Sequence, residues 1–309
     1  MVIRVSIVMP LYNKASSVAS SIASVLAQTF TDWELVVVDD GSTDDGVAIV
    51  AALADTRIRL VRQANAGVSA ARNRGVAEAR TDLIAFLDAD DLWLPEFLQR
   101  IVTLQSDFPQ AAWFATGYRI EQADGTGHAV RLKGLPQGFA RGVLANYFEV
   151  AAQSDPPVWT SATAVTKTAF SEMGGFPTGV HSGEDLLTWA RLASLYELAF
   201  DVSIQAVFQV SGIERRPDPS DQVGHALGNL YEAHPVAGLK SYLGLWYRMQ
   251  SVMAMRFNLR ALACRAAVKS VRFSPWNFRN WYSLGLSLLP SGFRSWLDVA
   301  ARNLFGKMR

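Results

Sequence analysis

Residues 80–93 constrain the fold and the chemistry of this chain more than any other segment. Within them, residues 83–87 form a short apolar run, which is typical of a strand buried on both faces. Three carboxylates follow this run at once: Asp88, Asp90 and Asp91. Clustered carboxylates repel each other, and burying them is costly unless cations or hydrogen-bond donors pair with them. Folding therefore explains this segment poorly by itself.

Asp88 and Asp90 are two residues apart, so extended backbone points both side chains to the same side. Two carboxylates at the carboxyl end of a strand suit a hard divalent cation such as Mg²⁺ or Mn²⁺. Such a cation takes waters and substrate phosphates as its remaining ligands. The alternative is a solvated Asp-rich turn, in which Asp91 caps the following helix.

Length and composition bound the class of protein. The 309 residues allow one large domain or two small ones, and half of them are hydrophobic. The single cysteine, Cys264, excludes an internal disulfide and fits a reducing compartment. The first residues read as a strand rather than a signal peptide, and we see no run of roughly 18 apolar residues. We therefore expect a cytoplasmic protein.

Charge is distributed unevenly along the chain. Residues 240–309 hold twelve Lys or Arg and one acid, whereas residues 1–239 hold 17 basic and 27 acidic residues. The tail also carries tryptophans at positions 246, 276, 281 and 296. Arg and Trp on amphipathic helices favour peripheral contact with an anionic membrane. Packing on the acidic part of the chain and a homodimer face are the alternatives.

Strands are expected to alternate with helices in the first 92 residues. The strands are predicted at 5–9, 35–38, 58–61 and 83–87, with helices at about 16–28, 44–53 and 68–79. This alternation predicts parallel pairing, and ligands of such sheets bind beyond the carboxyl ends of the strands. Further on we expect helices at 95–108, 139–151 and 184–194, strands at 111–120, 163–165 and within 198–210, and helices beyond 228.

Six motifs in order carry a family resemblance; they occupy residues 5–14, 35–44, 65–75, 86–91, 174–176 and 183–185. Together they resemble a family-2 glycosyltransferase, over roughly residues 3–215. The resemblance implies an inverting, nucleotide-sugar-dependent enzyme with an α/β, GT-A (Rossmann-like) mixed sheet flanked by helices, and a C-terminal helical extension. It implies a catalytic domain over 1–227, with a nucleotide-binding part at about 1–92 and an acceptor part at about 93–227. A basic helical extension would cover 228–309.

The resemblance also implies roles for individual residues around the nucleotide. Pro10, Tyr12 and Asn13 match the first nucleotide loop, where Tyr12 either stacks on the base or belongs to the core. Asp39 would contact the base or the ribose. Arg72 would fix the nucleotide end and the Asp-x-Asp loop.

The carboxylates take the remaining roles. Asp90 would contact Mn²⁺ or Mg²⁺ directly, and Asp88 would contact the ribose or the metal through water. Asp185 would be the general base that accepts the proton of the acceptor hydroxyl. Acids also favour the first turn of a helix through its dipole, which is the plain alternative for Asp185 and its neighbour Glu184.

Four other residues are weaker candidates. Arg215 or Arg216 could clamp the diphosphate or lie in a surface loop, and His181 precedes Asp185 by four residues. Trp159 is either a sugar platform or a core residue.

The expected function is the metal-dependent transfer of one sugar, from a UDP-sugar, to a hydroxyl of a glycan or lipid-linked glycan. Bacterial polysaccharide, lipopolysaccharide or glycoconjugate biosynthesis is the expected setting, in the cytoplasm and peripherally at the inner face of the cell membrane. Processive members of the family that this chain resembles carry a Gln/Arg-x-x-Arg-Trp segment after the base. No such segment follows residue 185, so the resemblance implies single addition. No nucleic-acid partner is expected. The alternative is a non-catalytic nucleotide-sugar-binding or assembly protein.

Overall fold

The computed structural model describes residues 4–180, 182–210 and 217–290, and the chain forms two compact units. The first unit is Met1–Ile213 and the second is Glu214–Arg309. The boundary expected between residues 227 and 228 falls inside helix α8 (Gln222–Ala233), which packs against α9 (Leu239–Arg256). This packing keeps α8 with the helices that follow it, so the division lies before α8.

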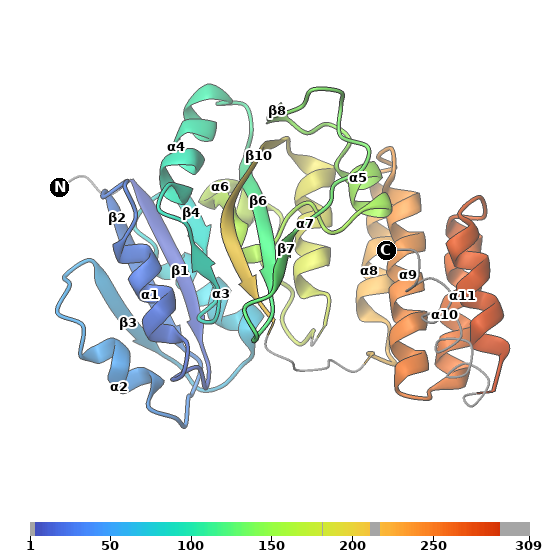
Figure 1. Ribbon diagram of the computed structural model, residues 1–309, viewed down its shortest axis with the longest axis horizontal. Helices are drawn as coiled ribbons and strands as arrows, with labels where there is room; N and C mark the ends of the chain where they lie inside the picture. The colour runs from blue at the N-terminus through green and yellow to red at the C-terminus, as the bar shows by residue number, and fades with distance from the viewer. Residues whose placement is uncertain (1–3, 181, 211–216, 291–309) are drawn as a thin grey trace. The chain divides into compact units, whose positions relative to one another are not determined.

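Four parallel strands form one half of the central sheet in the first unit (Figure 1). Their order is β3 (Ile58–Arg62), β2 (Trp33–Asp39), β1 (Val5–Leu11) and β4 (Leu83–Phe86). The connecting helices are α1 (Val18–Leu26), α2 (Gly46–Ala51) and α3 (Val68–Glu78). β2 and β4 are buried along their whole length, as expected when crossover helices cover both faces of a parallel sheet. The predicted alternation of strands and helices is confirmed.

The other half of the sheet makes it mixed. β9 (Thr163–Thr166) runs antiparallel to β4 and to β6 (Trp113–Glu121), and β6 pairs in parallel with β10 (Leu198–Gln209). The short strand β5 (Leu92–Trp93) pairs antiparallel with β10. The remaining elements of this half are α4 (Phe97–Asp107), β7 (Gly127–Ala129), β8 (Arg141–Val143), α5 (Tyr147–Gln153), a 3₁₀ turn (Thr160–Ala162), α6 (Lys167–Glu172) and α7 (Glu184–Leu195).

The helix expected over residues 139–151 is wrong in its first part. Arg141–Val143 form β8, which pairs antiparallel with β10, and α5 begins only at Tyr147. Gly142 weakens a helix by about 1 kcal/mol relative to alanine, whereas β10 offers this segment backbone hydrogen bonds. Tertiary pairing therefore overrides the local helical pattern.

Helix α3 approaches β1 closely enough to exclude a side chain. A Cβ atom on Gly75 would lie 2.3 Å from Cγ1 of Val8. Because the helix must approach this closely, the glycine fixes the position of the α3 residues three and two places before it, Arg72 and Asn73.

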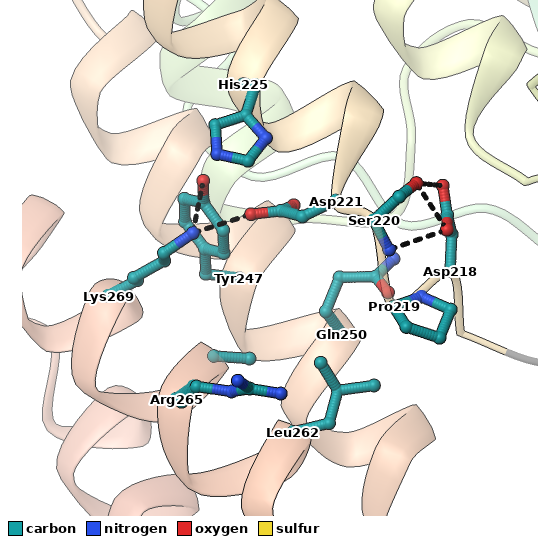
Figure 2. Close-up of a pocket in the computed structure, with 11 residues that line it drawn as sticks. Asp218, Pro219, Ser220, Asp221, His225, Tyr247, Gln250, Leu262, Arg265 and Lys269 are labelled. Carbon is teal, nitrogen blue, oxygen red and sulfur yellow. Dashed lines mark hydrogen bonds and ion pairs between the residues drawn. The ribbon is translucent and has the colours of Figure 1, made fainter.

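The second unit is helical in its described part, with α8, α9, α10 (Arg260–Phe273) and α11 (Phe278–Leu288). Among the described residues, no helix is both long and apolar enough to cross a membrane. A cavity of about 170 Å³ is lined by residues around α8, α9 and α10 (Figure 2). There Nζ of Lys269 lies 2.6 Å from Oδ2 of Asp221 and 4.7 Å from the ring centre of Tyr247. Burial raises the pKa of Tyr247.

Candidate active site

Three neighbouring parallel strands end at one edge of the sheet. β1 pairs with β2 so that Leu11 lies opposite Asp39, and β1 pairs with β4 so that Val8 lies opposite Phe86. The residues that follow or end these strands, Tyr12, Asp39 and Asp88, therefore emerge at adjacent strand ends. This is the edge at which open α/β sheets bind their ligands.

The loop after β1 is tied to the loop after β2. The backbone N–H of Asn13 donates to Oγ of Ser42 (3.2 Å), and Oδ1 of Asn13 accepts from the N–H of Thr43 (2.8 Å). Asn13 has a φ of 51°, in the left-handed region that asparagine tolerates better than most residues. Asn13 thus shapes this loop, while Pro10 lies within β1 itself.

Tyr12 is 48% exposed and so does not belong to the core. An exposed aromatic ring at the end of a central strand is available to stack on a planar ligand. The core alternative for Tyr12 is therefore wrong, and the stacking role stays a prediction.

The two aspartates at the end of β2 have different surroundings. Asp39 is 6% exposed, and its Oδ1 accepts from the N–H of Ser42 at 2.9 Å. Asp40 accepts from the N–H groups of Ala66 (2.9 Å) and Gly67 (2.8 Å), just before α3. Asp40 therefore orders the loop that leads into α3.

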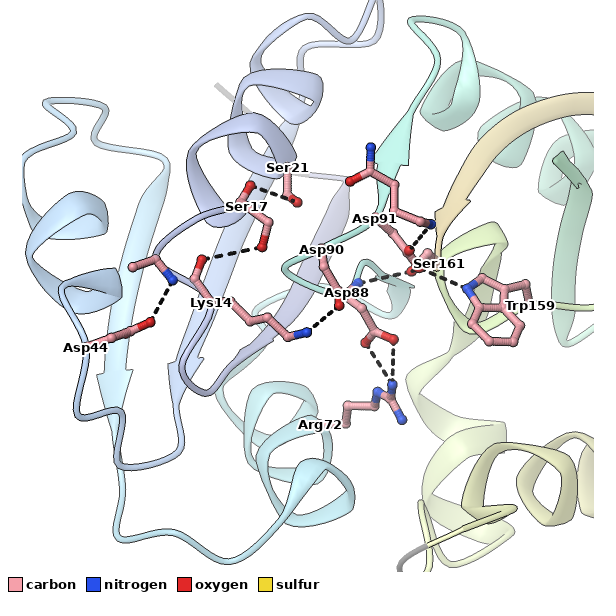
Figure 3. Close-up of polar contacts among 12 residues, drawn as sticks. Lys14, Ser17, Ser21, Asp44, Arg72, Asp88, Asp90, Asp91, Trp159 and Ser161 are labelled. Atoms are coloured by element: carbon pink, nitrogen blue, oxygen red, sulfur yellow. Dashed lines mark hydrogen bonds and ion pairs between the residues drawn. The ribbon is translucent and has the colours of Figure 1, made fainter. Parts of the chain in front are cut away.

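Arg72 of α3 holds Asp88. Its Nη2 lies 2.7 Å from Oδ1 and 2.9 Å from Oδ2 of Asp88 (Figure 3). Its Nη1 lies 3.9 Å from Oε1 of Glu184. The guanidinium also stacks over the ring of Phe176, 4.9 Å from its centre. Burial lowers the pKa of Arg72, but the charges of Asp88, Glu184 and Asp185 outweigh that effect, so the pKa is raised overall. Arg72 thus stays charged although it is only 3% exposed.

Lys14 forms an ion pair with Asp90 (Figure 3). The two side chains are 29% and 24% exposed, so the pair is open to solvent. Sequence reasoning did not assign a role to Lys14. The sequence did contain an indication of such a role, because Lys14 is the last residue of the first of the six motifs.

Asp91 does not cap the next helix, contrary to expectation. The residue before α4 is Glu96, and Asp91 is 1% exposed. It accepts hydrogen bonds from Oγ of Ser161 (2.6 Å), Nε1 of Trp159 (2.9 Å) and the N–H of Gln209 (3.0 Å). Burial, followed by the charge of Asp88, raises the pKa of Asp91 to about 7. Asp91 thus supports the loop that carries Asp88 and Asp90.

Trp159 is half-buried rather than open to solvent. Its ring centre lies 4.1 Å from that of Phe208 and 5.9 Å from that of Tyr118. Because its indole N–H donates to Asp91, Trp159 also orients the loop of residues 88–91, which we call the acidic loop.

Asp185 and Glu184 open α7 and face different partners. Glu184 is 2% exposed and lies near Arg72, whereas Oδ1 of Asp185 accepts from the N–H of Leu186 at 2.8 Å. The charge of Asp185 helps to raise the pKa of Arg72 and that of Tyr118, which burial raises first. Asp185 therefore lies close enough to Arg72 for their charges to interact.

A lock between two distant motifs was missed from the sequence. Nδ2 of Asn73 donates to the carbonyl of Phe176 (2.9 Å), and Oδ1 of Asn73 accepts from the N–H of Phe176 (2.9 Å). The Gly-Gly-Phe segment that leads toward α7 is thereby fixed to α3. In the sequence, the order of the motifs was the only indication of the contact between Asn73 and Phe176.

The described residues contain no group of three His, Cys, Asp or Glu side chains placed to hold a metal ion. Asp88 and Asp90 supply two carboxylates, the donor type that Mg²⁺ and Mn²⁺ prefer. Cations of this kind often use one or two carboxylates together with substrate phosphates. Asp88 and Asp90 therefore suit a cation that a bound diphosphate also coordinates. They do not suit a cation held by protein ligands alone.

Three weaker candidates, His181, Arg215 and Arg216, lie outside the described residues.

Residues 6–157 match the family model described as Glycosyl transferase family 2. The Escherichia coli protein "UDP-Glc:alpha-D-GlcNAc-diphosphoundecaprenol beta-1,3-glucosyltransferase WfgD" is 42% identical over 101 residues, 32% of this chain and 40% of that protein. "Succinoglycan biosynthesis protein ExoO" of Rhizobium meliloti is 43% identical over 99 residues, 32% of this chain and 28% of that one. The chain spans about a third of the length of the first curated relatives it matches.

Solved structures of S. aureus TarS share the fold. The structure of TarS 1-349 has a TM-score of 0.65 at 17% identity and covers 88% of this chain and 81% of that one. The structure of TarS 1-349 in complex with UDP-GlcNAc has a TM-score of 0.60 at 15% identity, with 92% and 90% covered. The expected GT-A fold class is confirmed. The order of the motifs, the mixed sheet and the family match agree, and residues 6–157 of this chain belong to glycosyl transferase family 2.

Proposed function

We propose that this protein is an inverting, metal-dependent glycosyltransferase that moves a single sugar from a nucleotide-diphosphate sugar to a hydroxyl group. The observation that carries the proposal is the meeting of polar groups at adjacent strand ends of β1, β2 and β4. Arg72 connects this edge to the first turn of α7 through Asp88 and Glu184. One ligand at the edge would therefore face both the acidic loop and α7.

UDP is the nucleotide that we propose. The name of WfgD specifies UDP-Glc, and a TarS structure contains UDP-GlcNAc. In the proposed complex Tyr12 stacks on the base and Asp39 accepts hydrogen bonds from the uracil edge or the ribose. Asn13 shapes the loop beneath them, Pro10 contributes from the end of β1, and Arg72 orients Asp88.

Asp90 and Asp88 would hold Mn²⁺ or Mg²⁺, with Asp90 in direct contact. When bound, the cation would neutralise charge on the leaving nucleoside diphosphate.

Asp185 is the proposed general base. It would accept the proton of the acceptor hydroxyl while that oxygen attacks the anomeric carbon, opposite the bond to the diphosphate. The new C–O bond forms as the old one breaks, so the anomeric configuration inverts. The diphosphate leaves with the bonding electron pair.

The proposed acceptor is a glycan or a lipid-linked glycan in polysaccharide, lipopolysaccharide or glycoconjugate biosynthesis. WfgD is named for a sugar linked to diphosphoundecaprenol, and ExoO for succinoglycan biosynthesis. A lipid-linked acceptor supports a location in the cytoplasm, at the inner face of the cell membrane.

Asp185→Asn tests the proposal against its control, Asp124→Asn, in an exposed turn. We expect Asp185→Asn to bind UDP within about twofold of the parent and to lose transfer by about 100-fold or more. The control should transfer at the parent rate. Parent-like transfer by Asp185→Asn would refute the proposed base. UDP-sugar binding without turnover by the parent, across a panel of acceptors with Mn²⁺, would favour the non-catalytic alternative.

A further inference from the structure

Helix α11 turns its polar side toward helices α9 and α10 of the second unit, and its apolar side away from them. Asn280, Ser283 and Ser287 are each at most 2% exposed, and their spacing of three and four residues places them on one helix face. A helix that stabilises a globular unit normally buries apolar residues instead. The arrangement of α11 therefore requires an explanation beyond the folding of this unit.

Hydrogen bonds fix this orientation. Nδ2 of Asn280 donates to the carbonyls of Ser270 (3.1 Å) and Ser274 (3.0 Å), and its Oδ1 accepts from Nη1 of Arg248 (3.1 Å). Ser283 and Ser251 share a hydrogen bond of 3.1 Å between their hydroxyls. Rotating α11 would leave these buried groups unpaired, at a cost of about 1–3 kcal/mol each. The outward position of its apolar residues is thus built into the unit.

Large apolar side chains cover the other side of α11 and the turn before it. This aromatic face consists of Trp276 (98% exposed), Phe278 (75%), Trp281 (54%), Tyr282 (60%) and Leu288 (56%). The indole N–H of Trp281 donates to the carbonyl of Pro275 at 2.8 Å. Trp281 can therefore enter an apolar medium without leaving an unpaired donor. Exposed apolar clusters of this kind mark interaction surfaces.

The charge of residues 240–288 indicates what kind of partner the aromatic face binds. Residues 240–288 contain eight Lys or Arg and no Asp or Glu. Two of these, Arg272 and Arg279, are exposed; Arg279 directly follows Phe278, and Arg272 lies four positions before Trp276. A surface with one sign of charge repels a second copy of itself and attracts an anionic surface.

We propose that the aromatic face is a membrane-docking surface that rests on an anionic lipid bilayer. Trp, Tyr and Phe place their rings at the headgroup level, and the flanking arginines bind lipid phosphates. The 11 residues of α11 are about 16 Å long, which suits a helix lying in the plane of the interface. This inference is independent of the proposed transfer reaction, because no part of it involves the first unit.

Co-sedimentation of the full chain with vesicles tests the docking surface, without any donor present. One vesicle set contains phosphatidylcholine only, and the other contains phosphatidylcholine mixed with phosphatidylglycerol. We expect binding to the mixed vesicles that weakens as salt is added. The Trp276→Ser/Phe278→Ser variant should lower the partition coefficient by about tenfold or more, because two apolar side chains no longer leave water. Arg272→Gln/Arg279→Gln should lower it by about 25-fold on the anionic vesicles, at fivefold for each arginine.

Two matched variants control for exposure and charge elsewhere on the chain. Leu195→Ser changes an exposed leucine (45%) of the first unit, and Arg74→Gln an exposed arginine, and both should bind as the parent does. Thermal unfolding checks that each variant is folded. Absence of binding by the parent, or parent-like binding by Trp276→Ser/Phe278→Ser, would overturn the proposal. So would a parent dimer that this double variant converts to a monomer in light scattering, because the face would then bind a second copy.

Discussion

Lys14 forms an ion pair with Asp90, although 76 positions separate them in the sequence. The ammonium group of Lys14 thus neutralises the carboxylate that we propose as the direct ligand of a divalent cation. A cation and an ammonium group cannot both neutralise one carboxylate fully, so the two compete. Lys14 would keep the charge of Asp90 neutralised until a cation and a diphosphate arrive together.

Replacing Lys14 by methionine should tighten Mn²⁺ binding to the nucleotide-free protein. Partly exposed ion pairs contribute up to about 1 kcal/mol, so we expect an affinity gain of about three- to fivefold. Electron paramagnetic resonance of free Mn²⁺ measures this affinity without any turnover. Arg74→Met, which removes an exposed charge on α3, is the control and should leave the affinity unchanged. Equal affinities for Lys14→Met and the parent would rule out the competition.

Arg72 should be far more important for stability than Arg74, although both lie on α3. Arg72→Met removes the cation that pairs with Asp88 and lies near the buried Glu184, and breaking a buried pair in this way costs about 3–5 kcal/mol. Arg74→Met removes only an exposed pair with Glu78, worth less than about 1 kcal/mol. Urea unfolding of the two variants gives both free energies. A loss below about 1 kcal/mol for Arg72→Met would show that the buried pairs are not stabilising.

Gly175 and Gly174 provide a matched test of the lock between Asn73 and Phe176. Both have a positive φ, 67° and 86°, so alanine strains the backbone at either position by about 1–2 kcal/mol. At Gly175 the new Cβ would also lie 2.8 Å from Oδ1 of Asn73, whereas nothing lies within 4 Å at Gly174. We therefore expect Gly175→Ala to lower the free energy of unfolding more than Gly174→Ala does. If both variants lose the same free energy of unfolding in denaturant, the side chain of Asn73 moves away from the new methyl group at no cost in free energy.

Asp55 should add stability that depends on pH. Hydrogen bonds from Arg57, its side chain first, hold the pKa of Asp55 below its usual value. A carboxylate with a depressed folded pKa stabilises the fold above its unfolded pKa of about 3.9, and this contribution is lost as the pH falls through the folded value. Because the side chain is 23% exposed, we expect less than about 1 kcal/mol. The difference in unfolding free energy between the parent and Asp55→Asn should be present at pH 7 and shrink in acid. A difference that does not change with pH would contradict the pairing.

Local patterns in the sequence were sufficient for the parallel half of the sheet and for the residues at its edge. Apolar runs and their spacing determine strands and helices, and parallel topology then brings the strand ends together. Asp39, Asp88 and Tyr12 could therefore be assigned to one edge without coordinates. The family and the GT-A fold followed from the order of the motifs.

Contacts between distant residues were decided only by the tertiary structure. The pairing of Lys14 with Asp90, of Asn73 with Phe176 and of Asp91 with Ser161 spans 76, 103 and 70 positions. Asp91 looked like a helix cap because nothing nearby in the sequence shows that it is buried among three donors. Likewise, β8 replaced an expected helix because β10 offered it backbone partners. Local sequence determines which groups a segment carries, but burial and long-range packing determine which of them meet.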